Sequence, residues 1–169
     1  LESSRTEKST TLLRFQEPTT RSGSLTMIKG LKDPKAMSAK VRAFITKFAP
    51  LAETIAEKYE LNVYVILGHG GMESGWGTSD VYLHSHNLFG IKEKDGKPVY
   101  MDGNVGYQAF ASDAECFEEY GKMMTDPRKN NYYKALPWRE SIWHYADMLR
   151  ELGYCPRTVE QSLLDTVGW

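Results

Sequence analysis

The sequence predicts a mainly α-helical (α+β) domain with a small β-hairpin lobe, and three observations lead to this prediction. Apolar residues recur at three- and four-residue steps between residues 38 and 59, which is the spacing of a helix with one buried face. The same spacing returns over residues 112–125 and 139–152. Between these stretches, residues 91–110 carry two Asp-Gly pairs among β-compatible residues, which is typical of one or two small hairpins.

The first helix is expected to begin near Ser38. Pro50 falls inside its apolar pattern, and a proline both lacks a backbone N–H and clashes with the preceding helical turn. We therefore expect either a kink at Pro50 or a break into two shorter helices. The buried face of this region would consist of Phe44, Phe48, Leu51, Ala52, Ile55, Ala56 and Tyr59.

A second helix is expected from Asn62, which suits an N-cap, to about Glu73. This helix contains Gly68, Gly70 and Gly71, and each glycine in a helix interior is unfavourable by about 1 kcal/mol relative to alanine. Small residues at such a cost indicate a close approach, either by a ligand or by another part of the chain. The sequence leaves both alternatives open.

The remaining helices are marked by signals at their ends. Ser112 and Glu115 have the spacing of a capping box, in which two side chains satisfy free N–H groups at the start of a helix. A short helix is expected around Tyr132-Tyr133, and a longer helix over residues 139–152. A final helix is expected from about residue 158 to residue 167.

Residues 1–34 are expected to form a Ser/Thr-rich N-terminal arm or linker, and residues 35–169 the folded domain. Ten of the first 24 residues are Ser or Thr, so burial of apolar groups there cannot offset the entropy of ordering. No apolar segment typical of a secretory signal follows the N-terminus. The longest apolar run, residues 63–67, is far shorter than the roughly 20 residues that a membrane span needs, so no span is expected.

Charge and composition argue against several functional classes. The 21 Lys and Arg residues balance 22 Asp and Glu residues, whereas a nucleic-acid binder needs many uncompensated cations. No third ligand stands at a metal-binding distance in sequence from His84 and His86, so we expect no metal and no cofactor. Cys116 and Cys155 allow at most one internal disulfide, and the sequence does not decide whether they are bonded.

Glu73 is the strongest candidate for chemistry. It ends a helix, whose C-terminal partial negative charge disfavours a second anion. We expect Met72, Trp76 and Leu88 to surround it and exclude water. Both effects favour a neutral carboxyl group that can donate a proton to a leaving oxygen. A surface glutamate at the end of an ordinary helix would show the same spacing.

Two sequence blocks resemble the signature of the family 73 glycoside hydrolases, the N-acetylglucosaminidases of bacterial autolysins and flagellar peptidoglycan hydrolases. These blocks are Glu-Ser-Gly-Trp-Gly at residues 73–77 and Asn-Leu-Phe-Gly-Ile-Lys at residues 87–92. Residues 107–112 and the late Gly-Tyr at 153–154 are also similar to the family pattern. The resemblance covers roughly residues 38–167. It implies a lysozyme-like helical fold with an active-site groove beside the β-lobe.

The resemblance also implies the reaction. It would be hydrolysis of the β-1,4 bond between N-acetylglucosamine and N-acetylmuramic acid in peptidoglycan, with Glu73 as general acid. The family's second carboxylate lies in a Thr-x-Glu-aromatic stretch that this sequence lacks, so Asp102 is the first candidate for that role, followed by Glu93 and Asp95. Alternatively, the 2-acetamido group of the substrate attacks the anomeric carbon, and the Tyr154 hydroxyl orients it.

Four further residues are candidates for binding the glycan. Trp76, Phe89 and Tyr107 could stack on sugar rings, although core packing is an equally ordinary role for Trp76 and Phe89. Asn87 is expected either to bond Glu73 or to hold a turn.

Two rival functions remain open from the sequence. One is a muramidase or lytic transglycosylase on the same scaffold, and the other is a non-catalytic module that binds peptidoglycan. The expected partners are glycan strands and, for an exported antibacterial effector, an immunity protein that occludes the groove. We expect a monomer that acts in the periplasm or cell wall and arrives there without a visible signal peptide, as an effector, a phage lysis enzyme or a trimmed chain.

Overall fold

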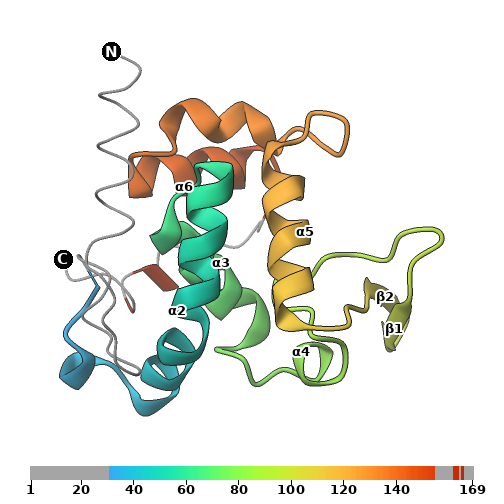
Figure 1. Ribbon diagram of the computed structural model, residues 1–169, viewed down its shortest axis with the longest axis horizontal. Helices are drawn as coiled ribbons and strands as arrows, with labels where there is room; N and C mark the ends of the chain where they lie inside the picture. Colours follow the sequence, from blue (N-terminus) through green and yellow to red (C-terminus); the bar gives the residue numbers. More distant parts are fainter. Residues whose placement is uncertain (1–30, 155–161, 164, 166–169) are drawn as a thin grey trace.

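The computed structural model describes residues 31–154, 162, 163 and 165, and this part of the chain is mainly helical. Figure 1 shows a group of packed helices with a small two-stranded sheet projecting beyond α5 on one side. This architecture confirms the predicted fold class. None of the described helices combines the length and the apolar character that crossing a membrane requires.

The elements follow one another from the N-terminal side in a simple order. The helices are η2 (Pro34–Ala36), α2 (Ala39–Tyr59), α3 (Val63–Ser74), α4 (Asp80–Ser85), α5 (Asp113–Thr125), η3 (Tyr132–Trp138) and α6 (Ile142–Glu151). The strands β1 (Val99–Asp102) and β2 (Val105–Gln108) lie between α4 and α5.

Helix α2 runs through Pro50 without ending there, so the expected break into two shorter helices is wrong. Pro50 is exposed, so the carbonyl group that loses its helical partner remains accessible to water. The buried face also continues on both sides of the proline, from Phe48 to Ala52. Tertiary packing of that face therefore outweighs the local cost of the proline.

Helix α3 is the buried centre of the molecule, since ten of its twelve residues are buried. Asn62 caps it as predicted, because its Oδ1 accepts hydrogen bonds from the backbone N–H groups of Tyr64 and Val65 at 3.0 and 3.2 Å. The Nδ2 of Asn62 donates to the carbonyl oxygen of Arg139 at 3.0 Å. One side chain thus starts α3 and ties it to the segment that leads into α6.

The glycines of α3 serve close packing within the chain. A Cβ atom at Gly70 would lie 2.9 Å from Leu88 Cδ2, and one at Gly71 would lie 2.2 Å from Trp76 Cζ3. Of the two alternatives that the sequence left open, these contacts support packing by the chain itself at both positions. The backbone of α3 is therefore covered by the side chains of the segment that follows it.

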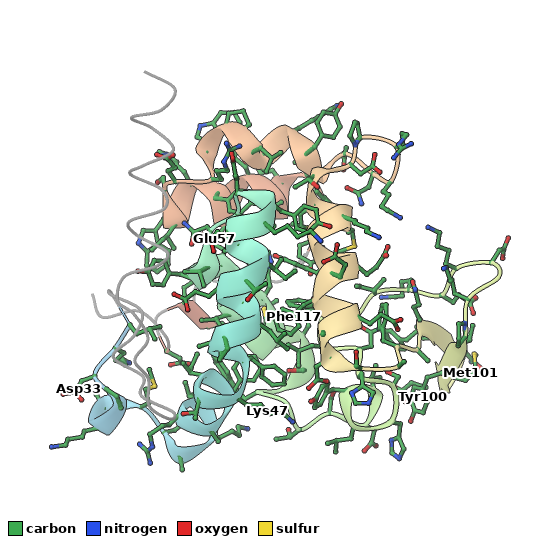
Figure 2. All side chains as sticks on the ribbon, in the orientation of Figure 1. Asp33, Lys47, Glu57, Tyr100, Met101 and Phe117 are labelled. Atoms are coloured by element: carbon green, nitrogen blue, oxygen red, sulfur yellow. The ribbon has the colours of Figure 1, made fainter. Side chains whose placement is uncertain are left out.

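A series of aromatic rings connects α2, α5 and the loop after α4. Phe48 stacks on Phe117 with centroids 5.8 Å apart, and Phe117 meets Phe89 edge-on at 5.1 Å. Phe89 in turn stacks on Tyr120 at 4.1 Å. Figure 2 shows Phe117 at the centre of the molecule, between α2 and α5. This packing fixes the loop after α4 against the helical core.

The predicted β-lobe is a single antiparallel hairpin. Val99 pairs with Gln108 at one end and Asp102 with Val105 at the other, so Asp102 lies beside the turn. An isolated bridge between Lys92 and Tyr107 extends the pairing toward the helical core. Figure 2 shows Tyr100 and Met101 at the outer margin of the molecule, far from Phe117.

The capping box of α5 is confirmed in a slightly shifted form. Ser112 Oγ accepts from the N–H of Glu115 at 3.2 Å, while Glu115 Oε1 accepts from the N–H of Ala111 at 2.8 Å. On the same helix, Cys116 is a buried free thiol, and burial raises its pKa to about 12.

The C-terminal part differs from expectation at one point. Helix α6 begins at Ile142 rather than near residue 139, because the preceding residues form the end of η3 and a turn in which the Ser141 N–H donates to the Trp138 carbonyl at 2.9 Å. Cys155, most of the predicted arm over residues 1–34 and most of the predicted helix over residues 158–167 lie outside the described residues.

Replacing the cap of α3 tests its contribution to stability. We expect Asn62→Ala to lower the free energy of unfolding by about 1–2 kcal/mol, since it removes both the N-cap and the donor to the Arg139 carbonyl. Asn62→Asp keeps the capping oxygen and should cost less. Urea denaturation followed by circular dichroism measures both losses, and equal losses would contradict the capping role.

Candidate active site

A cavity of about 560 Å³ lies where α3, the loop after α4, strand β2 and α5 meet. Its lining combines acidic, basic and aromatic groups with main-chain atoms. The lining residues are Glu73, Phe89, Gly90, Ile91, Lys92, Glu93, Lys94, Gln108, Glu119, Met123, Arg128, Lys129, Asn130, Tyr132, Gly153 and Tyr154. The cavity therefore lies between the helical body and the β-lobe, where the resemblance places a groove.

The Glu73 carboxyl group lies directly against the backbone of Gly90. Glu73 occupies the last turn of α3 and is half-buried. Gly90 has a φ of +68°, and a Cβ atom at this position would lie 2.8 Å from Glu73 Oε1. A side chain at residue 90 would displace the carboxyl group, so the two sequence blocks meet at this point.

The turn after Glu73 is fixed by the side chain of Ser74. Ser74 Oγ donates to the Gly70 carbonyl at 2.6 Å and accepts from the Gly77 N–H at 2.8 Å. Gly75 and Gly77 have φ values of +59° and +80°, which other residues adopt only with strain. These bonds end α3 immediately after Glu73.

Asn87 is a buried organiser of the second block. Its Nδ2 donates to the carbonyl groups of Ile91 and Gln108 at 2.9 and 2.7 Å, and its Oδ1 accepts from the Ile91 N–H at 3.0 Å. These bonds hold the turn over residues 87–91 and attach it to β2. The geometry thus supports the turn-holding role of Asn87 and explains how Gly90 is kept beside Glu73.

The aromatic candidates lie in different surroundings. Phe89 is 1% exposed and is part of the hydrophobic core, and its ring also forms part of the cavity wall. Trp76 packs edge-on against Phe44 at 5.3 Å and over Gly71, outside the cavity lining. Tyr107 lies on β2, also outside that lining, with Lys92 Nζ 5.0 Å from the centre of its ring.

Tyr154 lines the cavity from the C-terminal side. Its ring packs edge-on against His69 with centroids 4.6 Å apart, and in a tilted arrangement against Tyr132 with centroids 5.0 Å apart. His69 is completely buried, and its Nδ1 lies 3.1 Å from Tyr120 Oη. Burial lowers the pKa of His69 to about 3, so this imidazole is neutral at ordinary pH and supports the Tyr154 ring as an uncharged group.

The candidate second carboxylates separate in space. Glu93 lines the cavity, and its side chain covers Gly106, where a Cβ atom would lie 2.1 Å from Glu93 Oε1. The Glu93 N–H also donates to the Gly106 carbonyl at 2.9 Å. Asp102 lies at the exposed end of β1 and, like Asp95, outside the lining. The structure therefore brings Glu93, but not Asp102, to the same cavity as Glu73.

Sequence reasoning missed the charged residues on the far side of the cavity. Glu119 on α5 forms an ion pair with Lys129 at 3.2 Å, and Lys94 and Arg128 line the cavity nearby. No local pattern marks these residues, because loops distant in sequence bring them together. Within the described ranges, no group of three metal-ligating side chains is found.

A helical body with a carboxyl group at the end of its central helix, facing a cavity beside a small β-lobe, is the arrangement of lysozyme-like glycoside hydrolases. The comparison with protein families agrees with this class. The sequence model of the glucosaminidase family, described as mannosyl-glycoprotein endo-beta-N-acetylglucosaminidase, matches residues 49–162. Since this match covers more than half of the chain, the chain belongs to the glucosaminidase family, family 73 of the glycoside hydrolases.

Individual relatives agree with the family. The chain is 36% identical over 138 residues to the peptidoglycan hydrolase FlgJ of Pseudomonas aeruginosa, and the match covers 71% of this chain and 34% of that protein. The chain thus spans less than half the length of the curated relatives that it matches.

Solved structures share the fold. The glycoside hydrolase domain of FlgJ from Salmonella typhimurium superposes with a TM-score of 0.59 and 20% identity, covering 73% of this chain and 86% of that one. A type VI secretion system effector–immunity complex from Pseudomonas protegens contains a chain that superposes with a TM-score of 0.55 and 18% identity, covering 76% and 89%.

The burial of His69 predicts a dependence of stability on pH. The pKa of His69 is lowered from 6.5 to about 3, so below pH 6.5 the unfolded chain binds a proton that the folded chain does not. The contribution of His69 is complete above pH 6.5 and is lost as the pH falls toward 3. We expect its share of the free energy of unfolding to decrease by about 1 kcal/mol per pH unit around pH 5.

Denaturation at pH 7, 6, 5 and 4 measures this slope. His69→Gln should flatten it, whereas His144→Gln, at an exposed position, should leave it as in the parent chain. An unchanged slope in His69→Gln would contradict the account.

Proposed function

We propose that this chain hydrolyses the β-1,4 bond between N-acetylglucosamine and N-acetylmuramic acid in peptidoglycan, with Glu73 as the general acid. The observation that carries this proposal is the Glu73 carboxyl group, held against Gly90 at the edge of a 560 Å³ cavity. Membership of the glucosaminidase family supports the class of bond, and the FlgJ relative supports peptidoglycan as the substrate.

Glu73 supplies the proton that the leaving sugar oxygen requires. Its carboxyl group lies in the last turn of α3, at the edge of the cavity. As the glycosidic bond breaks, Glu73 donates this proton, and positive charge develops on the anomeric carbon. The contact with Gly90 restricts the carboxyl group to one side of the cavity, which keeps it near the bond to be broken.

The second catalytic group is proposed to be Glu93. It shares the cavity with Glu73, whereas Asp102, the leading candidate from the sequence, lies at the exposed hairpin turn. A carboxylate at Glu93 would either activate a water molecule or stabilise the charge on the sugar ring. In the alternative route the substrate's acetamide group attacks the anomeric carbon, and Tyr154 on the cavity wall orients it.

The glycan is proposed to lie across the Tyr132–Tyr154 pair, with the buried Phe89 ring forming part of the wall behind it. The tyrosine rings line the cavity, and sugar CH faces pack well on aromatic surfaces. Tyr107 and Trp76 lie outside the cavity lining. On this proposal they could contact only those sugars of the strand that extend out of the cavity. Asn87 acts indirectly, because its bonds hold the turn that carries Gly90.

An antibacterial role is a second proposal, and one observation favours it. The chain shares its fold with a structure described as a type VI effector–immunity complex. On this proposal the chain acts in the periplasm or cell wall of a target cell, and an immunity protein in the producing cell occludes the cavity. Affinity purification of the Glu73→Gln chain from its native host tests this, and recovery without a tightly bound partner would count against it.

The general acid is tested by Glu73→Gln. We expect a loss of kcat of about 10²- to 10⁴-fold on purified peptidoglycan, because glutamine cannot donate a proton. Glu57→Gln, at an exposed position on α2, serves as the matched control and should retain activity. Mass spectrometry of the digest identifies the bond, and new reducing N-acetylglucosamine ends support the proposal.

Other products would assign the chain to a rival class. Reducing or anhydro N-acetylmuramic acid ends would identify a muramidase or a lytic transglycosylase. Binding to peptidoglycan without any cleavage by the unaltered chain would identify a non-catalytic module.

The second catalytic group is tested by comparing Glu93→Gln with Asp102→Asn. We expect the Glu93 variant to lose about 10²-fold or more in kcat, and the Asp102 variant to stay close to the unaltered chain. A larger loss of kcat in Asp102→Asn than in Glu93→Gln would instead assign the second catalytic role to Asp102. Full activity in both variants, together with a large loss in Tyr154→Phe, would favour the acetamide-assisted route.

A further inference from the structure

Three basic side chains surround the cavity on the side away from α3. Lys94 lies in the loop before β1, and Arg128 and Lys129 follow α5; all three line the cavity. Figure 1 shows both loops on the hairpin side of α5. We refer to Lys94, Arg128 and Lys129 as the basic rim.

Carboxylates of the chain neutralise two members of the rim. Arg128 forms two bonds to Asp126, with Nε 3.0 Å from Oδ1 and Nη2 2.9 Å from Oδ2. Lys129 Nζ lies 3.2 Å from Glu119 Oε2. Within the described part of the chain, no carboxylate lies at ion-pair distance from Lys94.

Lys94 and Lys129 line the same cavity. The neighbouring Lys129 side chain lowers the pKa of Lys94 although Lys94 is fully exposed. Two ammonium groups that face one cavity repel each other, and an anion bound beside both would reduce this repulsion. The single carboxylate of Glu119 leaves the pair with an excess positive charge at the cavity mouth.

We infer that Lys94 and Lys129 form a subsite that binds a carboxylate group of the substrate beside the glycan cavity. This inference rests on the proposed function, because the subsite shares the cavity of Glu73. Peptidoglycan offers carboxylates from two sources, the lactyl group of peptide-free N-acetylmuramic acid and the acidic residues of the peptide stem. A polymer of N-acetylglucosamine alone offers none, so the subsite distinguishes peptidoglycan from neutral glycans.

The subsite is tested by binding, with Glu73→Gln in every protein so that the ligands remain intact. Titration calorimetry compares three probes: a neutral chitooligosaccharide, a peptide-free peptidoglycan tetrasaccharide and the same tetrasaccharide with peptide stems. We expect Lys94→Gln to weaken the acidic probes about fivefold more than the neutral probe, the range of an exposed charge contact. Lys97→Gln, in the same loop but outside the cavity lining, is the matched control.

The pattern of losses identifies the source of the carboxylate. A loss confined to the peptide-free probe assigns the subsite to the lactyl carboxylate, and a loss confined to the stem-bearing probe assigns it to the peptide. A loss on both acidic probes shows that the subsite accepts a carboxylate from either source. The difference between Lys94→Gln and its parent should also shrink at high salt, because a surface charge contact is screened.

Two results overturn the inference, and they differ from failure of the proposed function. Equal weakening of neutral and acidic probes in Lys94→Gln overturns the subsite, as does an equal effect in Lys97→Gln. Cleavage of peptidoglycan by the chain with Glu73 intact is measured separately. Its absence overturns the proposed function, and the binding data then still decide whether Lys94 recognises a carboxylate.

Discussion

The close approach of the Gly90 backbone to the Glu73 carboxyl group is the constraint on which the rest of the site depends. It requires α3 to end at one residue, which Ser74 ensures through its bonds to Gly70 and Gly77. It also requires the loop after α4 to keep one path, which Asn87 ensures by bonding both the loop and β2. Two buried polar side chains thus fix the two halves of the site independently.

The site and the core share residues, so the stability of one affects the geometry of the other. Phe89 closes the cavity from beneath while it stacks on Tyr120 and meets Phe117 edge-on. His69 supports Tyr154 and contacts the hydroxyl of Tyr120. A substitution in this aromatic layer would therefore change both the free energy of unfolding and the shape of the cavity. Asn62 is different, because it stabilises α3 at the end remote from Glu73.

Sequence reasoning succeeded where the signal is local. The caps at Asn62 and Ser112 and the hairpin that turns at Asp102-Gly103 depend on a few neighbouring residues, and the structure has them as expected. Of the two alternatives expected at Pro50, a kink or a break, the break was wrong because the buried face of the helix continues on both sides of the proline.

The site residues show the same difference between local signals, which the sequence reveals, and long-range packing, which it does not. The place of Glu73 at the end of α3 and the turn held by Asn87 could be predicted because two conspicuous blocks mark them, and the family match covers both blocks. The basic rim could not be predicted, since Lys94 and Lys129 lie far apart in sequence and line one cavity only in the folded chain. The choice between Glu93 and Asp102 likewise depends on which carboxylate faces the cavity, which spacing does not reveal.

The burial of Cys116 has a consequence for redox behaviour. Its thiol lies against the backbone of Leu88 and Phe89, beneath the loop that carries Gly90. Burial raises the pKa of this thiol to about 12, so the reactive thiolate is scarce at neutral pH. Disulfide exchange at this position is therefore slow in the folded chain, and Cys116 stays reduced in oxidising surroundings unless the loop and α5 separate.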